Sequence, residues 1–447
     1  MKETDQPGIS TVTNSGRSLE GRRVLFVSYN GMLDPLGQSQ VLPYLRELAQ
    51  LGVQFTLLSF ERNDKLIANG SGRIAELHAE LANVRIEWHW LRYHQRPSLP
   101  ATAFDVANGI RVASSLVRKN QIEMVHARSH IPATIALALK RKFGTRMIFD
   151  VRGLMADEYV DANHWKKGSI PYRLTKSMES RALKAADGVV TLTNAIWPII
   201  KSWEPLRTRD DVSHAVVPCC ADLDLFRFSE SDRERRRREL ELSDDQLVFV
   251  YSGSIDGWYL TEEMANFFAV VLKRRPNSHV VWLTPTRHER IRQLMNDRGL
   301  SSSRYSIVSA APRDVPSYLS ASDAGVAFIK PCFSKLASSP TKYAEYLGCG
   351  LPLIINAGIG DSDSLVEHER TGHLVSEFNE AEFEKALATI ERFTNESVAT
   401  RNLTRAAAQR LFDVKRVGVE NYARLYESVL PNSRTDAVFA TEPDATV

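Results

Sequence analysis

The segment SSPTKYAEYLGCGLPLIIN, residues 338–356, combines the signals of a helix and of a strand that follows it. Ser339 is a favourable N-cap residue, and Pro340 suits the first helical position, where no backbone N–H is needed. The glycines of LGCGLP predict the end of the helix, and the apolar run at 353–355 predicts a short buried strand. The segment therefore predicts a helix whose start faces a ligand.

The start of a helix carries unpaired N–H groups and a partial positive charge, which together favour phosphate. Thr341 and Lys342 stand in this first turn, and Lys342 adds a full positive charge. Glu345 lies one turn further along, where its carboxylate could accept hydrogen bonds from two sugar hydroxyl groups. Phosphate at the helix start and ribose one turn behind it describe a nucleotide. The same pattern also fits an ordinary amphipathic helix with a surface lysine and a surface glutamate.

Strands and helices alternate along the chain on both sides of this segment. Buried strands are expected at residues 23–28, 53–59, 84–90, 123–126, 147–151, 188–192, 212–217, 247–251, 280–283, 305–308, 324–329 and 372–375. Helices are expected between most of these strands, including one that Ser39 caps. Because this alternation is typical of parallel sheets with right-handed crossovers, the sequence predicts an α/β protein with two doubly wound, Rossmann-like domains.

The alternation breaks at PCCADLDLF, residues 218–226, so we expect a domain junction between about 205 and 240. The basic run that follows it, at 235–238, is flanked by glutamates and is interpreted as a solvated helix face. The expected organisation is a disordered tail at 1–20, an N-terminal domain at 21–210, a C-terminal domain at 211–412, a final helix at 413–430 and a second disordered tail at 431–447.

The composition is that of a soluble globular protein, with 447 residues, 43% hydrophobic and 25% charged. The net charge of +3 is too small to favour a nucleic-acid partner. No apolar run approaches the roughly 20 residues that cross a bilayer, and the N-terminus lacks the order of a signal peptide. We expect a cytoplasmic protein that can also touch the inner face of the plasma membrane. The 4 cysteines show neither metal-binding nor disulfide spacing and are expected to be small buried side chains.

Polar residues follow three of the expected strands, in the segments 31–37, 126–128 and 150–158. Ligands of open α/β sheets bind beyond the carboxyl ends of the strands, so these segments are expected to converge on one crevice. The motifs of P-loop, zinc-protease and serine-hydrolase sites are absent, and no G-x-G-x-x-G follows the first strand. Glu61, after the second strand, is a hint of a ribose-binding acid of the dinucleotide type.

Gly253 follows another expected strand, where a glycine lets the backbone approach a phosphate closely. Gly253 and the helix start at Ser339 could hold the two ends of a diphosphate. Fixed N–H groups and a nearby lysine would stabilise the charge that develops on such a leaving group, without a metal. This arrangement suits a reaction in which a nucleoside diphosphate leaves.

Segments spread along the chain resemble the retaining glycosyltransferases of family four. They are GMLDPLGQSQVLPYL (31–45), VHARSHIPA (125–133), IFDVRGLMADE (148–158), ADGVVTLT (186–193), VVPCCADLDLF (216–226), VYSGSIDGWYL (250–260) and SPTKYAEYLGCGLPLIIN (339–356). The resemblance covers roughly residues 22–430. It implies the GT-B fold, in which two Rossmann-like domains face each other across a cleft. The donor would bind the C-terminal domain, the acceptor the N-terminal domain, and the final helix would cross back to the first domain.

The resemblance also implies roles for single residues. Glu345 would bind the donor ribose, the backbone of Gly253 would bind the diphosphate, and Gly37 would belong to a loop near the donor phosphate and the acceptor. The chain departs from the family at Ala337, where a first glutamate is common, and at Arg152, where relatives have a histidine. The usual arginine after the glycine turn is also absent, so a lysine would supply that charge.

The candidate site residues fall into three groups. The catalytic candidates are Asp150, Arg152 and His126; the donor-binding candidates are Gly253, Ser254, Lys330, Lys335, Ser339, Thr341, Lys342 and Glu345; the acceptor and phosphate loop comprises Gly37, Gln38 and Arg128. The expected partners are a nucleotide-sugar donor and a glycan or lipid-linked acceptor, with no metal or other cofactor. The alternatives are a GT-B-like epimerase or phosphorylase, and a catalytically weak nucleotide-sugar-binding scaffold.

Overall fold

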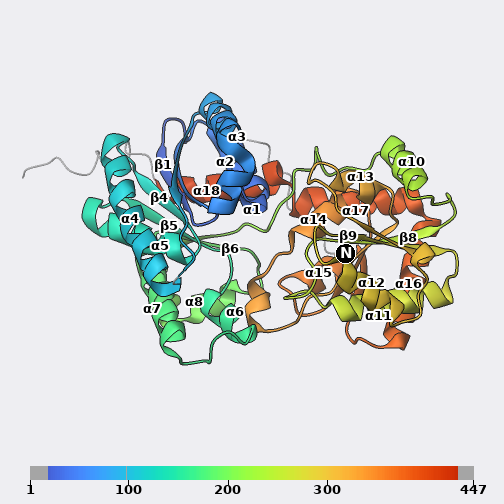
Figure 1. Cartoon of the computed structure of the whole chain (residues 1–447). Coiled ribbons are helices and arrows are strands. Elements are labelled where there is room, and N and C mark those ends of the chain that lie inside the picture. The colour runs from blue at the N-terminus through green and yellow to red at the C-terminus, as the bar shows by residue number, and fades with distance from the viewer. Residues whose placement is uncertain (1–18, 97, 431–447) are drawn as a thin grey trace, which may run out of the picture.

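The computed structural model describes residues 19–96 and 98–430, which form two α/β domains side by side (Figure 1). The expected disordered tails at 1–20 and 431–447 lie outside the described residues, except for Leu19 and Glu20. Leu19 is fully buried in the core of the first domain, so that domain begins before residue 21.

The first domain is built on a 7-stranded parallel sheet in the order β3-β2-β1-β4-β5-β6-β7. Its strands are β1 (Arg23–Ser28), β2 (Gln54–Glu61), β3 (Ile86–Arg92), β4 (Met124–Arg128), β5 (Arg146–Val151), β6 (Gly188–Thr191) and β7 (Ser213–Val216). Its helices are α1 (Pro35–Gln40), α2 (Leu42–Gln50), α3 (Asn63–Asn83), α4 (Ser98–Lys119), α5 (His130–Phe143), α6 (Met155–Asp161), α7 (Ile170–Ala185), α8 (Trp197–Ser202) and α9 (Glu204–Arg207). Because helices cover both faces of the sheet, its inner strands β1, β2, β4, β5 and β6 are nearly continuous buried runs.

The second domain repeats this plan on a 6-stranded parallel sheet in the order β10-β9-β8-β11-β12-β13. Its strands are β8 (Leu247–Ser252), β9 (Ser278–Leu283), β10 (Tyr305–Val308), β11 (Ala324–Ala327), β12 (Leu353–Asn356) and β13 (Gly372–Val375). Its helices are α10 (Glu230–Glu239), α11 (Thr261–Arg274), α12 (His288–Asn296), the 3₁₀ turn η2 (Ser302–Arg304), α13 (Val315–Ser320), the 3₁₀ turn η3 (Phe333–Ala337), α14 (Thr341–Gly348), α15 (Ser362–Glu367), α16 (Glu380–Asn395) and α17 (Ser397–Leu411). The prediction of two Rossmann-like α/β domains is confirmed.

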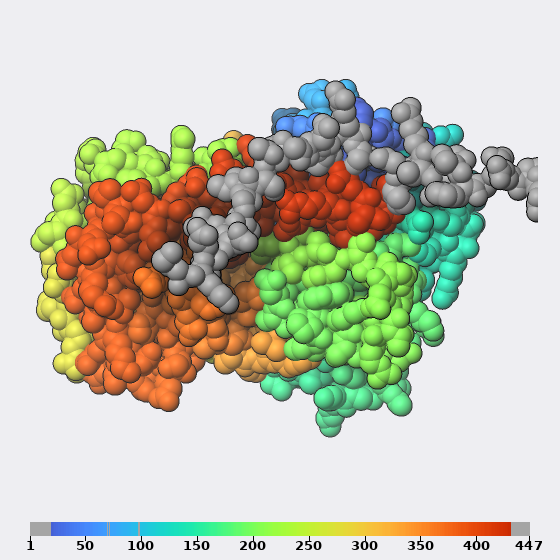
Figure 2. Space-filling model, turned by 180° about the vertical axis from the view of Figure 1, so that it is seen from behind, coloured from blue at the N-terminus to red at the C-terminus, as the bar shows by residue number. Residues whose placement is uncertain are grey.

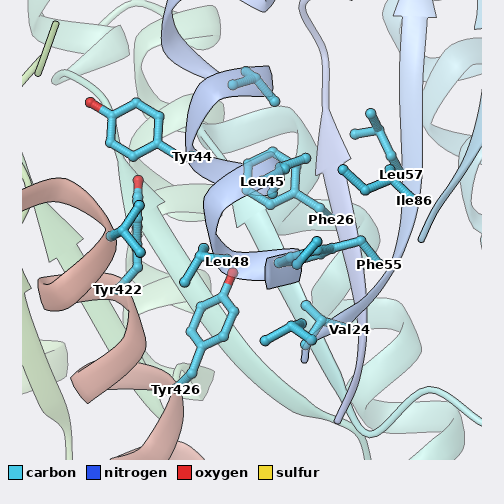
Figure 3. Packing of buried hydrophobic residues seen from close by; sticks show 14 of the residues in the cluster. Val24, Phe26, Tyr44, Leu45, Leu48, Phe55, Leu57, Ile86, Tyr422 and Tyr426 are labelled. Atoms are coloured by element: carbon cyan, nitrogen blue, oxygen red, sulfur yellow. The ribbon is translucent and has the colours of Figure 1, made fainter. Parts of the chain in front are cut away.

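The chain returns to the first domain through the π-helical turn η4 (Val414–Val419) and helix α18 (Glu420–Val429). Figure 2 shows this segment, in red, passing from the second domain to the first. Tyr422 and Tyr426 of α18 belong to the core of the first domain, where Tyr422 packs edge-on against Tyr44, with ring centres 5.6 Å apart (Figure 3). The final helix therefore lies where the resemblance placed it.

One expected domain boundary and one helix differ between the prediction and the structure. Strand β7 pairs with β6, so the first domain extends past the expected boundary at residue 210. Helix α3 was not expected, because Gly70 interrupts it with a non-helical backbone (φ 66°) and obscures its period. A hydrophobic period is hard to recognise in short strands and interrupted helices, because few residues contribute to it.

The expected caps and the solvated basic face are wrong in detail. Ser39 lies inside α1, and its hydroxyl donates to the Pro35 carbonyl rather than capping a helix. Helix α14 begins at Thr341 with Pro340 as its N-cap, and the Ser339 hydroxyl accepts instead from the Cys219 amide. In the basic run of α10, Arg237 is buried and forms an ion pair with Asp323 at 2.8 Å, because α10 packs against α13.

Candidate active site

Helix α14 presents Lys342 and Glu345 from its first turns. Lys342 is buried, and its Nζ lies 3.6 Å from the ring centre of Tyr259 and 4.3 Å from that of Tyr251. Burial lowers the pKa of Lys342 to about 7, although Glu345 opposes that change. This lysine is neither solvated nor on the surface, which contradicts the simple amphipathic helix.

The Glu345 carboxylate is available to a ligand. Within the described residues it has no hydrogen-bond or ion-pair partner, and the residue is only half-buried. Burial raises the pKa of Glu345 to about 7, and the nearby Lys342 opposes that rise. A carboxylate held this way gains strongly from hydrogen-bond donors that a ligand brings.

The glycine turn after β8 lies directly against this pair. Gly253 has φ +123°, and a Cβ atom there would lie 3.1 Å from the Lys342 Nζ. The Gly253 amide already donates to the Leu283 carbonyl at 2.9 Å, so the expected contact from this amide to a diphosphate is wrong. The exposed Ser254 follows, and its carbonyl accepts a hydrogen bond from the Tyr251 hydroxyl.

Lys330 and Lys335 point to the first domain rather than to the donor helix. Lys335 forms an ion pair with Glu158 of α6 at 3.2 Å and stacks over Trp258. Lys330 donates to the Asp161 carbonyl at 3.0 Å. Helix α6 engages both lysines, and their role as a charge for the donor stays a prediction. Lys342 is the lysine that lies against the glycine turn.

The catalytic candidates His126 and Asp150 form a buried network with α18. The His126 Nδ1 lies 2.7 Å from the Tyr426 hydroxyl, and the Tyr422 hydroxyl donates to Asp150 at 2.9 Å. Both His126 and Asp150 are fully buried. Burial lowers the pKa of His126, so its imidazole is neutral near pH 7. These contacts tie the ends of β4 and β5 to the final helix.

Arg152 connects this network to the second domain. Its Nη1 lies 3.7 Å from Asp150, and its Nη2 donates to the Cys219 thiol at 3.4 Å. The Cys219 amide in turn donates to the Ser339 hydroxyl at 3.1 Å. Where the domains meet, Arg152 therefore contacts Cys219, and Cys219 contacts Ser339, two residues before α14. Burial alone would raise the pKa of Asp150, but Arg152 and then His126 lower it.

Arg128 ends strand β4 beside these groups. It is buried, and its Nη1 donates to the Asn30 side chain at 3.1 Å. Burial, and then the charge of Arg152, lower the pKa of Arg128. The segments after β1, β4 and β5 thus converge at one edge of the sheet, as the sequence predicts.

Gly37 and Gln38 shape the loop after β1. A Cβ atom on Gly37 would lie 2.2 Å from the Gly31 carbonyl oxygen, and Gln38 donates to the Met32 carbonyl at 2.6 Å. Glu61 is fully buried and accepts from the Met32 amide at 2.6 Å. The hint that Glu61 binds ribose is wrong, because its carboxylate holds this loop.

Comparison with known proteins agrees with this geometry. Residues 37–197 match the family model of the glycosyl transferase 4-like domain. No curated protein matches the chain by sequence.

Solved structures share the fold over nearly the whole chain. Sucrose-phosphate synthase from Thermosynechococcus elongatus is 17% identical, with a TM-score of 0.68, over 91% of this chain and 99% of that one. Anabaena HepE in complex with UDP-glucose is 14% identical, with a TM-score of 0.65, over 91% of this chain and 99% of that one. WaaG, a glycosyltransferase involved in lipopolysaccharide biosynthesis, is 14% identical, with a TM-score of 0.63, over 92% of this chain and 100% of that one. The chain therefore shares the two-domain GT-B fold of these proteins.

Sequence reasoning missed the aromatic residues of this candidate site. Tyr251 and Tyr259 enclose Lys342, while Tyr422 and Tyr426 close the network of His126. The aromatic pair of GWYL beside the glycine turn was a signal for the first set. The spacing of four between the two tyrosines of α18, which places them on one face, was a signal for the second.

The described part of the chain contains no group of three or more His, Cys, Asp or Glu side chains that could hold a metal ion. Among the same residues, no helix has the length and apolar character needed to span a membrane. Cys219, Cys220 and Cys349 are buried, as expected, whereas Cys332 is partly exposed.

Proposed function

We propose that this protein transfers a sugar, with retention of configuration, from a nucleoside-diphosphate sugar to a glycan or lipid-linked acceptor. The observation that carries the proposal is the Glu345 carboxylate, which has no partner in the part of the chain that the structure describes and lies one turn behind a helix start that holds the buried Lys342. That pair fits a ribose and a diphosphate. Support comes from HepE, a protein of the same fold that was solved with UDP-glucose.

The residues at the glycine turn suit a departing diphosphate. The free N–H groups at the start of α14 and the Lys342 ammonium group would stabilise its developing charge, with Ser254 taking the place of Gly253 as the backbone donor. The anion would restore the full charge of Lys342, because a neighbouring negative charge raises a lysine pKa. Neither a pair of carboxylates at glycosidase spacing nor a metal is part of this mechanism.

The setting we propose is cell-surface polysaccharide biosynthesis, in the cytoplasm or at the inner face of the plasma membrane. WaaG, which shares the fold, is involved in lipopolysaccharide biosynthesis and supports this setting. A lipid-linked acceptor would bring such an enzyme to the membrane surface.

The test is ligand-detected NMR of the purified protein with UDP, GDP and ADP. We expect one nucleotide to bind selectively and Glu345→Ala to weaken it about 10- to 100-fold, since hydrogen bonds to a charged group are worth about 1.5–3 kcal/mol. Glu367→Ala, which removes an exposed carboxylate from α15, is the matched control. Equal affinity in wild type and Glu345→Ala would contradict the donor site.

Turnover assays distinguish this function from the alternatives. We expect transfer to persist when a chelator removes divalent metal ions, and a strict requirement for added Mg²⁺ would contradict the proposed mechanism. A requirement for free phosphate would indicate a phosphorylase, and interconversion of nucleotide sugars without acceptor an epimerase. Tight donor binding with no turnover on any acceptor would indicate a scaffold.

A further inference from the structure

Helix α7 of the first domain exposes a face on which every charged side chain is basic. This α7 face, as we name it, comprises Ile170, Arg173, Leu174, Ser177, Arg181 and Lys184. At about 100° per residue, these positions fall within about 100° of the helix circumference, opposite the side that packs on the core. Ile170 is 75% exposed, Leu174 is 53% exposed, and the three basic side chains are exposed as well. The face therefore presents two aliphatic side chains and three positive charges to water.

The carboxylates nearest to α7 already have partners on the inner side of the helix. Glu179 of α7 is buried, forms an ion pair with Lys176, and has an oxygen 3.0 Å from the His130 Nε2. Asp157 of α6 accepts from the same lysine at 3.2 Å. The basic side chains of the α7 face, by contrast, have no hydrogen-bond or ion-pair partner within the described residues. Their charges are therefore open to a partner from outside the chain.

Neighbouring segments add further positive charge to the α7 face. Lys166 and Lys167 stand in the turn before α7, and Arg141 lies on α5; all three are exposed, and among the described residues no group pairs with their side chains. Helix α9, which packs against α7, adds the exposed Glu204 and Arg207, whose charges cancel. The surface thus gains three charges beyond the three of the α7 face, although the whole chain has a net charge of only +3. Positive charge is concentrated here.

A hollow between α5 and α7 opens on this basic surface. Its volume is about 360 Å³, and it is lined by Leu137, Lys140, Arg141, Arg181, Lys184 and Ala185. Lys140 forms an ion pair with Asp187, which leaves the other three cations of the lining for a ligand. No carboxylate lines the hollow within the described residues. Its size and charge fit a single phosphate group.

The two aliphatic side chains indicate the kind of partner. Ile170 and Leu174 stand one turn apart at the start of α7, directly after Lys166 and Lys167. Anionic lipid headgroups attract lysine and arginine, and aliphatic side chains beside them enter the boundary between headgroups and acyl chains. A nucleic acid would neutralise the same charges but would leave Ile170 and Leu174 in water. The surface is therefore complementary to an anionic bilayer.

Helix α6 connects α7 to the place where the two domains meet. It contacts both α7 and η3 of the second domain, and the Ser334 amide of η3 donates to the Asp161 carboxylate of α6 at 2.9 Å. Figure 1 shows α7 at the outer end of the first domain, with α6 between it and the second domain. A membrane on the α7 face would lie one helix away from the junction of the domains.

We propose that the α7 face docks on a bilayer surface that contains anionic phospholipid. Ile170 and Leu174 enter the headgroup region, and the hollow between α5 and α7 holds the phosphate of one headgroup. This inference rests on the proposed function, whose membrane contact it assigns to named residues. Docking through α7 keeps the enzyme beside a lipid-linked acceptor and leaves the donor helix α14, in the other domain, free of the membrane.

The experiment is co-sedimentation of the full chain with vesicles of phosphatidylcholine alone and of phosphatidylcholine mixed with phosphatidylglycerol. We expect binding to the mixed vesicles only, and weaker binding as the salt concentration rises. The triple variant Arg141→Gln, Arg181→Gln, Lys184→Gln should bind about 100-fold more weakly, since each basic residue at an anionic surface contributes about five-fold. The double variant Ile170→Ser, Leu174→Ser keeps every charge and should bind about ten-fold more weakly.

The matched control removes the same amount of charge from the second domain. It is the triple variant Arg238→Gln, Arg313→Gln, Arg370→Gln, which changes three exposed arginines and should bind the mixed vesicles within about two-fold of wild type. Binding of UDP, GDP and ADP is measured in every variant by NMR. It should not change, because the substituted side chains lie outside the donor site, and it also shows that each variant is folded.

The outcomes separate this inference from the proposed function. If the mixed vesicles do not bind, or if the control variant loses as much binding as the triple variant of the α7 surface, docking through α7 is wrong, while nucleotide binding still supports the donor site. If vesicles bind as expected but no nucleotide does, the donor site is wrong and the docking surface stands. Binding of duplex DNA that depends on Arg181 and Lys184 but not on Ile170, without vesicle binding, would overturn the membrane surface in favour of a nucleic acid.

Discussion

Lys342 and Glu345 are titratable residues that the fold withdraws from water, the lysine fully and the glutamate in part. Burial disfavours the charged form of both groups, so the pKa of the lysine falls to about 7 and that of the glutamate rises to about 7. Burying these two groups lowers the stability of the protein, and a diphosphate and a ribose bound there would offset this loss. Perturbed groups of this kind are typical of functional sites.

The pH dependence of stability tests the burial of Glu345. Its folded pKa, about 7, exceeds its usual value of 4.5, so its contribution to stability is full below 4.5 and is lost as the pH rises through 7. Glu345→Gln lacks this titration. Relative to wild type, the variant should gain about 1–2 kcal/mol of unfolding free energy between about pH 5 and about pH 7.

Urea unfolding of Glu345→Gln at the two pH values measures this gain. The exposed Glu367→Gln is the control, and its stability relative to wild type should not change with pH. If the difference in unfolding free energy between wild type and Glu345→Gln does not change with pH, the Glu345 carboxyl of the wild type is solvated.

The backbone at Gly253 is a second test at this scale. Gly253→Ala should lower the unfolding free energy by about 2–3 kcal/mol, because φ +123° is strained for alanine and the new Cβ meets Lys342 at 3.1 Å. Gly257→Ala, in the same loop, should cost only about 1 kcal/mol, since φ +65° is left-handed helical and no heavy atom lies within 4 Å. Thermal or urea unfolding checks both values, and equal costs would contradict the contact with Lys342.

Helix α18 supplies hydroxyl groups to buried residues that stand far earlier in the chain. Tyr422 donates to Asp150, 272 residues away in sequence, and Tyr426 bonds His126, 300 residues away. The helix therefore completes the network at the ends of β4 and β5, in addition to covering the core.

Tyr422→Phe should cost about 1.5–3 kcal/mol of unfolding free energy, because it removes a donor from a buried carboxylate. Tyr343→Phe is the matched control: the Tyr343 hydroxyl is buried without a hydrogen-bond partner among the described residues, and it lines a hollow of about 470 Å³ between the domains. Removing this hydroxyl should leave the unfolding free energy unchanged or raise it. Urea unfolding compares the two, and similar losses would show that the bond to Asp150 contributes nothing specific.

At the scale of the whole molecule, polar contacts hold the two domains together. The Asp361 carboxylate of the second domain accepts from the Asn194 amide at 2.8 Å, the Asn194 side chain at 3.0 Å and the Ala195 amide at 2.9 Å. Lys335 and Glu158 add an ion pair at another point of the interface. Domains of one chain that polar contacts join can commonly move relative to each other.

Asp361→Ala should therefore increase the radius of gyration of the ligand-free protein in small-angle scattering. Asp363→Ala is the control, because that carboxylate accepts from Gly358 and Ser362 within the same domain. An unchanged radius in Asp361→Ala would show that the other contacts hold the arrangement by themselves.

Local patterns were enough to predict the alternating strands and helices, helix α14 and the place of Glu345 on it. Buried parallel strands and helix ends depend on neighbours in sequence, so their signals survive in a single chain. The convergence of 126–128 and 150–158 also followed, because consecutive parallel strands end at the same edge of a sheet.

Only the tertiary structure decided which charged groups remain available. Lys330 and Lys335 look like Lys342 in sequence, yet α6 engages the first two and tyrosines enclose the third. The sequence by itself therefore determined the two α/β domains and helix α14, through hydrophobic periods of two to four residues. Folding decided the partners of the lysines and of Asp150, because contacts between residues more than a hundred positions apart leave no local pattern.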